Sequence, residues 1–218
     1  MMKQTNIVEK IKQDIIIGVL KGGEPLKIEP LKERYQIGGS PIREALNQLA
    51  AENFIKFIPA KGFQAYALSL AHVEDIYIAR IAIEKAALIQ AIDNACDESN
   101  ALVVAAHYKL AALEKNKAFR ADPSIAQYLA RYREFHLSLF MSCPSDTLKR
   151  LLMQLYDQSE RYRYYRFMHV DLLKNIDEKA KQHTVLVDLY LNGDTKGAVD
   201  LLVTLLSATV SRIKQSIA

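Results

Sequence analysis

Apolar and polar positions follow a helical period along most of the chain. Near its beginning, apolar residues every three or four positions predict a helix over about residues 6–20, ended by Gly22-Gly23. The apolar face of this helix is made of Ile7, Ile11, Ile15 and Val19. Between residues 31 and 53 the same spacing predicts two further helices close together.

The segment LKERYQIGGSPIREALNQLAAEN, residues 31–53, predicts a short helix, a tight turn through Gly38-Gly39 and a second helix. We expect Ser40 to be the N-cap of the second helix, because its hydroxyl can accept a hydrogen bond from a first-turn amide. Pro41 fits the first helical position, where its missing N–H has no partner to lose. The buried face of this second helix is predicted to contain Ile42, Ala45, Leu46 and Leu49.

Arg43 and Asn47 lie four residues apart on another face of the second helix. Both side chains can donate hydrogen bonds to phosphates or to base edges. A helix-turn-helix that binds DNA is therefore one interpretation of the segment. A helical hairpin that does not touch DNA is the other.

A β-hairpin is predicted directly after the second helix. Residues 54–59 and 63–66 are rich in aromatic and β-branched side chains, and Ala60-Lys61-Gly62 forms the turn between them. A hairpin at this place is a wing with Lys61 at its tip. The wing favours the DNA-binding interpretation, in which Lys32 and Lys61 would contact the DNA backbone.

The rest of the chain is predicted to be helical. No glycine occurs between Phe63 and Asn192, and this stretch contains two prolines, Pro123 and Pro144. We expect helices near residues 70–92, 97–117, 123–142, 146–167, 171–192 and 195–216. In this prediction Asp122-Pro123 opens the third helix and Ser69 caps the first, whereas Asn192-Gly193-Asp194 ends the fifth helix and caps the sixth. The fold class is mostly α, with domains at residues 1–68 and 69–218.

Charge and cysteine content restrict the class of protein to which the chain can belong. The net charge is +4, and residues 1–70 hold ten Lys and Arg against seven Asp and Glu, so the small basic excess lies in the predicted DNA-binding part. Two cysteines without a CxxC pair, no signal peptide and no apolar run of about 20 residues favour a soluble cytoplasmic protein without membrane contact.

Sequence motifs for catalysis are missing. The chain has no G-x-S-x-G, HExxH or P-loop sequence, and Glu134 and His136 are two residues apart, so they do not share a helix face. A binding protein is therefore favoured over an enzyme. Two alternatives remain: an adaptor that uses the helical part for protein partners, and a metal-dependent helical-bundle enzyme or metal sensor that uses His136 and His183.

The segment SPIREALNQLAAENFIKFIPAKGF resembles the winged helix-turn-helix of the GntR family of bacterial repressors, and the likeness covers most of residues 5–68. The resemblance implies DNA contacts by Lys32, Ser40, Pro41, Arg43, Asn47, Lys61 and Gly62. The family commonly has Ser-Arg where this chain has Gly38-Gly39. One phosphate or base contact of the family is therefore expected to be missing.

The helical part resembles the FCD effector domain of the FadR branch of that family. The likeness is carried by four short motifs: Asp75-Ile-x-x-x-Arg80-x-x-x-Glu84, Glu134-Phe-His136, Gln182-His183 and Asn192-Gly-Asp194-x-x-x-Ala198. The resemblance implies a homodimer on a palindromic operator. It also implies that a small carboxylic acid or acyl ligand in the bundle releases or repositions the protein.

The resemblance also raises the question of a metal. Family members often bind a divalent ion through an Asp four residues before a His and two later His. This chain keeps His136 and His183, but Tyr132 and Leu205 stand at the other two positions. We therefore expect no cofactor, and interpret the two histidines as hydrogen-bonded residues that line a pocket. A site completed by water stays the alternative.

Without a metal, arginine is the side chain best suited to bind a carboxylate. Arg80 either faces the pocket or pairs with Glu84 on the helix surface. On residues 146–167, Arg163 and Arg166 follow an apolar face and are expected to end near the pocket, unless they reach solvent. The predicted ligand site therefore contains Arg80, Tyr132, His136, Tyr162, Arg163, Arg166 and His183. This inventory favours a small mono- or dicarboxylate over a long acyl chain.

Overall fold

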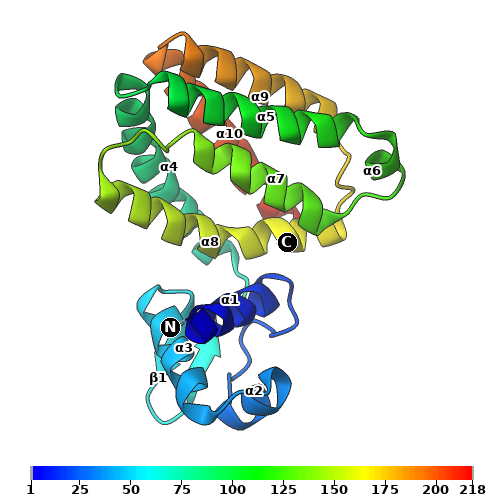
Figure 1. Ribbon diagram of the computed structural model, residues 1–218. Helices are drawn as coiled ribbons and strands as arrows, with labels where there is room; N and C mark the ends of the chain where they lie inside the picture. Colours follow the sequence, from blue (N-terminus) through cyan, green and yellow to red (C-terminus); the bar gives the residue numbers. More distant parts are fainter. Residues whose placement is uncertain (1, 218) are drawn as a thin grey trace.

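A computed structural model describes residues 2–217, so the outer ends of the two predicted domains, residues 1 and 218, lie outside the described residues. The first part of the chain is a winged helix-turn-helix (Figure 1). Its elements are α1 (Met2–Ile16), α2 (Ile28–Tyr35), α3 (Gly39–Ala51), β1 (Ile55–Ile58) and β2 (Gly62–Ala65). The two strands pair antiparallel, with Ile55 opposite Ala65 and Ile58 opposite Gly62. The predicted wing is confirmed.

The second part is all helical, as predicted. It contains α4 (Leu70–Asp93), α5 (Asp97–Lys115), α6 (Lys117–Ala121), α7 (Ile125–Ser138), α8 (Asp146–His169), α9 (Ile176–Leu191) and α10 (Thr195–Ile217). The short helix α6 was not predicted. It forms because the Asn116 side chain accepts a hydrogen bond from the Phe119 amide (3.0 Å), which caps a new turn directly after α5.

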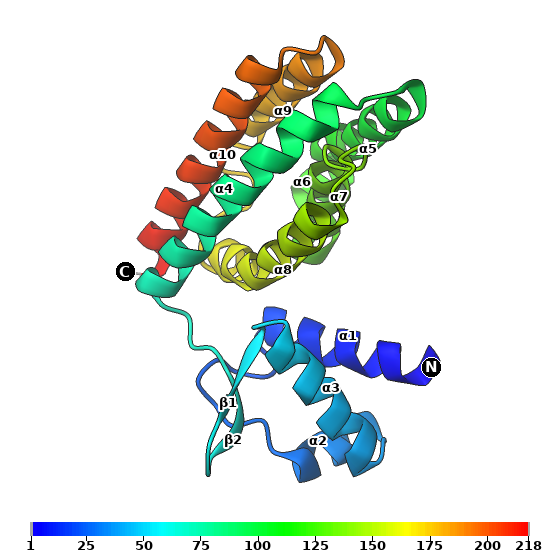
Figure 2. The same ribbon diagram turned by 90° about the vertical axis from the view of Figure 1, so that its left-hand side faces the viewer.

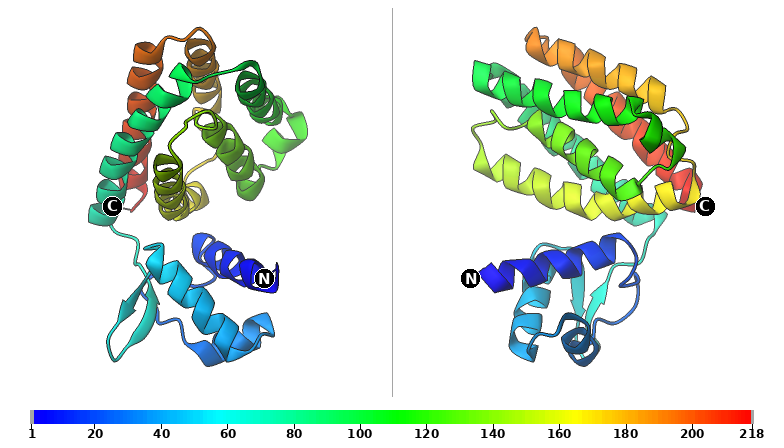
Figure 3. Two further views of the ribbon diagram at one scale, coloured as in Figure 1. Left: turned by 60° about the vertical axis from the view of Figure 1, so that its left-hand side comes forward. Right: turned by 45° about the vertical axis from the view of Figure 1, so that its right-hand side comes forward.

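The helical part lies above the winged helix-turn-helix, and α8 is the layer that faces it (Figure 1). Figure 2 shows α4 and α10 side by side and antiparallel, and they are in contact along their length. In Figure 3, α5 and α9 form the side of the bundle that is farthest from α1. Helix α8 contacts α1 below it and α4, α7 and α10 in the bundle.

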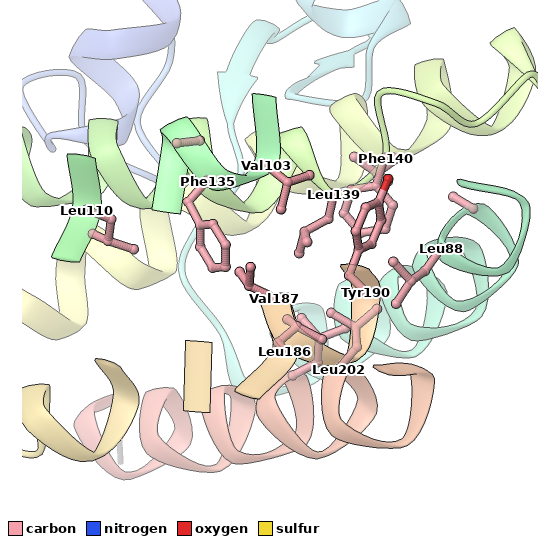
Figure 4. Packing of buried hydrophobic residues seen from close by; sticks show 14 of the residues in the cluster. Leu88, Val103, Leu110, Phe135, Leu139, Phe140, Leu186, Val187, Tyr190 and Leu202 are labelled. Carbon is pink, nitrogen blue, oxygen red and sulfur yellow. The ribbon is translucent and has the colours of Figure 1, made fainter. Parts of the chain in front are cut away.

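Each part has its own apolar core. In the bundle, apolar side chains from three helices pack together (Figure 4). They include Phe135 of α7, Leu139 directly after α7, Leu186 of α9 and Leu202 of α10. The winged part packs α1, α3 and the strands around a second cluster that includes Ile11, Leu46 and Ala65. Tyr164 of α8 packs against both clusters. No helix of the described chain is long and apolar enough to cross a membrane.

A buried lysine joins the two parts. Lys12 of α1 is 7% exposed, and its Nζ lies 2.9 Å from Asp157 of α8 and 3.3 Å from Glu52 at the end of α3. The Gln158 amide of α8 also donates to the Glu52 carbonyl at 3.1 Å. Burial alone would lower the pKa of Lys12, but these carboxylates raise it, so the lysine stays charged.

The predicted end of the first helix is wrong. Helix α1 stops at Ile16, and Gly18 adopts φ 79°, a left-handed conformation that glycine takes without a Cβ penalty. The chain therefore leaves the helix before Gly22-Gly23. Ile7, Ile11 and Ile15 are buried as predicted, whereas Val19 lies beyond the helix and is 44% exposed.

The prediction of Ser40 as an N-cap and Pro41 as the first helical residue is also wrong. Helix α3 begins at Gly39 with Gly38 as the N-cap, and the Ser40 hydroxyl lies 3.3 Å from the Glu44 carboxylate. Pro41 is the third helical residue, where its missing N–H still costs no intrahelical bond. The left-handed residue of the turn is Gln36 (φ 54°), whereas Gly38 has φ −63°.

Two helix starts in the bundle differ from the prediction. Asp122 ends α6, and α7 begins after Ser124, whose hydroxyl accepts from the Gln127 amide at 3.3 Å. Helix α9 begins at Ile176 rather than 171, because the Asp171 carboxylate accepts from the Leu173 amide (2.9 Å) and favours a turn. The predicted caps at Ser69 and Asp194 are confirmed by bonds from the His72 and Gly197 amides.

A Gly22→Ala substitution is expected to destabilise the protein. A Cβ at Gly22 would lie 2.6 Å from both the Tyr66 carbonyl and the Arg161 guanidinium of α8, closer than van der Waals contact allows. We expect the free energy of unfolding to fall by about 1–3 kcal/mol in urea titrations. Gly39→Ala is the matched control, because its Cβ would meet side-chain carbons at 3.5 and 3.6 Å. An equal effect of both substitutions would contradict this packing.

Candidate functional site

The exposed face of α3 carries the side chains predicted to contact DNA. Ile42, Ala45, Leu46 and Leu49 are buried, which fixes the rotation of α3 and turns Arg43 and Asn47 to solvent. The two exposed side chains are one helical turn apart, so they can reach the same stretch of a groove. Ser40 is exposed beside them, at the beginning of the helix, and Pro41 is half-buried.

The wing presents Lys61 at its tip. The Lys61 amide donates to the Ile58 carbonyl at 3.0 Å, which closes the turn, and the Lys61 side chain is exposed. Gly62 follows with φ 81°, a conformation suited to glycine. Ala60 has φ 62° in the same turn, where a residue with a Cβ is disfavoured.

Lys32 on α2 is partly exposed, and its Nζ lies 2.8 Å from the Glu29 carboxylate one turn earlier. Surface pairs of this kind contribute about 0–1 kcal/mol, so a DNA phosphate can replace the carboxylate.

A buried polar network lies inside the bundle. The Arg80 guanidinium of α4 donates to Glu84 Oε1 at 2.6 Å and to Ser159 Oγ of α8 at 2.9 Å. His136 Nε2 of α7 lies 2.8 Å from Glu84 Oε2. Arg80 and Glu84 are 1% and 0% exposed, so the predicted surface pair is a buried pair instead. This network ties α4, α7 and α8 together.

The charge states in the network follow from its contacts. Burial alone would raise the pKa of Glu84, but Arg80 and His136 hold it at about 2, so the carboxylate is ionised. Burial lowers the pKa of His136 despite Glu84, so the imidazole is neutral at pH 7. A neutral ring beside a carboxylate donates from Nε2, which leaves that nitrogen without a free lone pair for a metal.

A cavity lies next to this network, between α7, α8, α9 and α10. It contains about 520 Å³ of empty space, its open mouth included. The lining residues are Tyr128, Leu129, Tyr132, Arg163, Arg166, Phe167, Lys179, His183, Leu205, Thr209 and Arg212. Among the described lining residues there are four cationic side chains and no Asp or Glu.

Four of the predicted ligand residues line this cavity: Tyr132, Arg163, Arg166 and His183. Arg80 and His136 lie in the network behind it and are not lining residues. The expected position of Tyr162 near the pocket is wrong. Its hydroxyl lies 2.8 Å from His72 Nδ1 and 3.4 Å from the Ser69 amide, at the beginning of α4. Tyr162 is one position before Arg163 and therefore points to a different side of α8.

The other seven cavity residues were not predicted: Tyr128, Leu129, Phe167, Lys179, Leu205, Thr209 and Arg212. Spacing could have found the two cations among them. Lys179 is four residues before His183 on the same face of α9, and Arg212 is seven residues after Leu205 on the same face of α10. In the sequence, Leu205 is notable only as the residue that stands at a metal-ligand position of the family pattern.

Two cavity residues have strongly shifted pKa values. Burial, with Arg166 and Arg212 nearby, lowers the pKa of Lys179 to about 8, and Glu114 opposes this shift. Burial is the largest cause that lowers the pKa of His183 to about 3, so this ring is neutral. Burial also raises the pKa of Glu114 to about 7. Among the described residues, the positive charge of the cavity therefore lacks a full set of counter-charges.

The side chains of this cavity fit a metal poorly. His136 Nε2 is engaged with Glu84, and Tyr132 and Leu205 occupy the other two ligand positions of the family pattern. Across residues 2–217 no group of three or more His, Cys, Asp or Glu side chains is placed to hold a metal ion. Of the two candidate ligands, His183 alone lines the cavity.

Comparison with known proteins matches both parts of the chain. Residues 3–64 match the bacterial regulatory proteins of the gntR family, and residues 75–208 match the FCD domain. The chain is 33% identical over 207 residues to the HTH-type transcriptional regulator BphR of Paraburkholderia xenovorans (95% of this chain, 83% of BphR). It is 31% identical over 209 residues to the HTH-type transcriptional repressor GlaR of Escherichia coli (95% of this chain, 94% of GlaR).

A solved structure of E. coli McbR/YncC has the same fold, with a TM-score of 0.82 at 21% identity over 99% of this chain and 98% of that one. Matches to regulators over nearly the whole length, rather than to enzymes, agree with the exposed α3 face and the wing. The chain therefore belongs to the GntR family of bacterial DNA-binding transcriptional regulators, with an FCD domain as its helical part.

Proposed function

We propose that the protein is a repressor that binds a palindromic operator as a homodimer and is released by a small carboxylate in the helical domain. Residues 1–68 bind DNA in this proposal, and residues 69–218 bind the effector and the second subunit. The observation that carries it is a cavity in the FCD domain whose described lining has four cationic side chains and no carboxylate. GlaR, which has 31% identity to this chain, is itself described as a repressor.

In the DNA-bound state, the exposed face of α3 enters the major groove, with Arg43 and Asn47 toward base edges or phosphates. Lys32 and Lys61 approach the DNA backbone on either side of α3. The amides at the beginning of α3, near Ser40, favour a phosphate through the helix dipole. Since the net basic excess is small, these specific contacts carry most of the affinity.

Helix α8 supports a route from the effector to DNA. One side of α8 carries Arg163 and Arg166 to the cavity, and the other carries Asp157 and Gln158 to α1 and α3. An anion that draws the arginines inward moves the helix on which the winged domain rests. Two bound half-sites need a fixed distance between two recognition helices, so a small change of this kind is enough to weaken binding.

We also propose that the effector is bound without a metal. The orientation of His136 toward Glu84 and the place of Leu205 in the cavity support this. A metal-sensing regulator that uses His136 and His183 is the second candidate, and it is less favoured because these contacts leave too few ligands. Metal analysis of the purified protein distinguishes the two, since a stoichiometric ion would support the sensor.

Replacing Arg43 by Ala is expected to weaken operator binding by about 1–3 kcal/mol if the side chain reads a base. Fluorescence anisotropy on DNA obtained by selection from a random pool would measure this. Arg131→Ala is the matched control, because Arg131 is an exposed arginine on α7 that shares its partner Glu134 with Lys109 of α5, on the side of the bundle farthest from α1. Equal binding of wild type and Arg43→Ala would contradict the assignment.

A Gly39→Arg substitution is expected to strengthen DNA binding. The space at Gly39 admits a Cβ, and a cation there would restore a contact that the family commonly has. One added phosphate contact steepens the dependence of log affinity on log salt by about 0.9. Gly39→Gln serves as an uncharged control of similar length. An unchanged salt slope with Gly39→Arg would show that this position is away from DNA.

Carboxylate affinity is expected to fall as pH rises from 7 to 9. The pKa of Lys179 in the free protein is about 8, and a bound anion raises it, so the anion prefers the protonated form that is lost above pH 8. The charged groups around Lys179 are Arg166, Arg212, Glu114 and Glu178. Glu114 has a pKa of about 7. It therefore becomes negatively charged as pH rises and repels the anion, which lowers the affinity further.

At pH 9 the loss relative to pH 7 would be about tenfold from Lys179 alone. Calorimetric titration with a carboxylate at several pH values measures it. Lys179→Met should remove the decline of carboxylate affinity above pH 8. Glu114→Gln should remove the decline of affinity near pH 7. An affinity that rises with pH would refute this account of the cavity.

A further inference from the structure

We propose that the effector is a dianion, a short aliphatic dicarboxylate that spans the cavity with one carboxylate at each end. This inference rests on the proposed function and specifies the chemical class of its effector. It follows from the division of the cavity's polar side chains into two groups, in a cavity that apolar side chains also line.

The first group consists of Arg163, His183 and Tyr132. Arg163 is 4% exposed, and its Nε and Nη2 atoms are buried without a hydrogen-bond acceptor among the described residues. His183 Nδ1 is likewise buried without a partner in the described chain. The Tyr132 ring lies between them, 5.6 Å from the Arg163 guanidinium and 5.6 Å from the His183 ring.

Buried donors of this kind are rare, because each costs about 1–3 kcal/mol when it lacks an acceptor. A carboxylate supplies two oxygens and matches the planar guanidinium. The nearby carboxylate Glu160 does not serve, since it pairs with Arg133 at 2.8 Å. An acceptor must therefore come from outside the described chain.

The second group consists of Arg166, Lys179 and Arg212. The Arg166 guanidinium and Lys179 Nζ lie 4.8 and 5.3 Å from the Phe167 ring centre. Mutual repulsion with Arg212 lowers the pKa of both, after the larger effect of burial. Three cations that repel one another in a partly buried site favour a second anion.

The two groups are separated by about one helical turn. Arg163 and Arg166 are three residues apart on α8, and His183 and Lys179 are four apart on α9. At a rise of 1.5 Å per residue these spacings correspond to about 4.5 and 6 Å. Such a distance suits the two carboxylates of a four- or five-carbon diacid. Leu129 and Leu205 line the cavity and can contact the methylene groups.

Charge balance distinguishes a dianion from a monoanion. A monoanion neutralises charge in one group and leaves the charge of the other group without a counter-ion. A dianion neutralises charge in both groups. Glu114 near Lys179 supplies part of a counter-charge, but its pKa of about 7 keeps much of it protonated at neutral pH. A dianion is therefore expected to bind at least tenfold more tightly than a monoanion of equal length.

Calorimetric titration of the full-length protein tests this with glutarate and succinate against valerate and butyrate, with sodium sulfate as a compact dianion. Tighter binding of either diacid than of its matched monoacid and of sulfate supports the proposal. Equal affinities for diacid and monoacid would overturn it. Sulfate bound as tightly as the diacids would also overturn it, because a compact ion cannot span two groups.

Substitutions test which residues bind each of the two carboxylates. Lys179→Met should reduce glutarate affinity at least tenfold and bring it close to that of valerate. Arg163→Lys keeps the positive charge but loses the planar guanidinium that can donate two hydrogen bonds to one carboxylate. It should weaken glutarate binding similarly. Arg150→Gln, an exposed change on α8, should have no effect. Thermal melts check folding, and an unchanged glutarate affinity in Lys179→Met would overturn the two-ended arrangement.

Failure of this proposal is distinguishable from failure of the proposed function. Sequence-specific DNA binding without any preference for diacids would leave a regulator with another effector class. Diacid binding by calorimetry without sequence-specific DNA binding would refute the regulator and leave the ligand class standing.

Discussion

Positive charge is buried on α8, and the helices around α8 pack so as to accommodate it. Arg161, Arg163 and Arg166 are each at most 6% exposed, although they follow one another within two turns of one helix. Buried cations need partners or they destabilise the fold. The bundle supplies aromatic faces, with Tyr156 4.0 Å from the Arg163 guanidinium, but residues 2–217 leave hydrogen-bond donors of Arg163 without an acceptor. A site that is incomplete in this way suits a protein whose partner is a signal molecule.

The same helix also holds the two domains together. Asp157 pairs with Lys12 of α1 and with Arg133 of α7, so one carboxylate connects the DNA-binding domain with the wall of the cavity. Ser159 accepts from Arg80, which fixes α8 against α4. These contacts make α8 the element through which a change in the cavity would reach α1. The buried Arg80–Glu84–His136 network is complete without a ligand, and it gives the cavity a rigid wall.

Much of the fold could be predicted from the sequence, because helical period and missing glycines are local signals. The buried face of α3, the wing and the caps at Ser69 and Asp194 follow from such signals. The errors arose where a side chain redirected the backbone, as Asn116 does for α6 and Asp171 does before α9. The cavity was harder to predict, since Arg80 and Arg163 look alike in sequence. Arg80 has its hydrogen-bond acceptor in Glu84, and the burial of Glu84 becomes apparent only in the folded structure.

An anion in the cavity is proposed to weaken DNA binding through α8. The most direct test is the operator affinity of the wild-type protein, measured by fluorescence anisotropy with and without saturating glutarate, after calorimetry has shown that glutarate binds. The account predicts that saturating glutarate weakens operator binding at least tenfold. It also predicts a smaller effect in Asp157→Asn, which weakens the contact between α8 and Lys12. An operator affinity unchanged by bound glutarate would contradict the account.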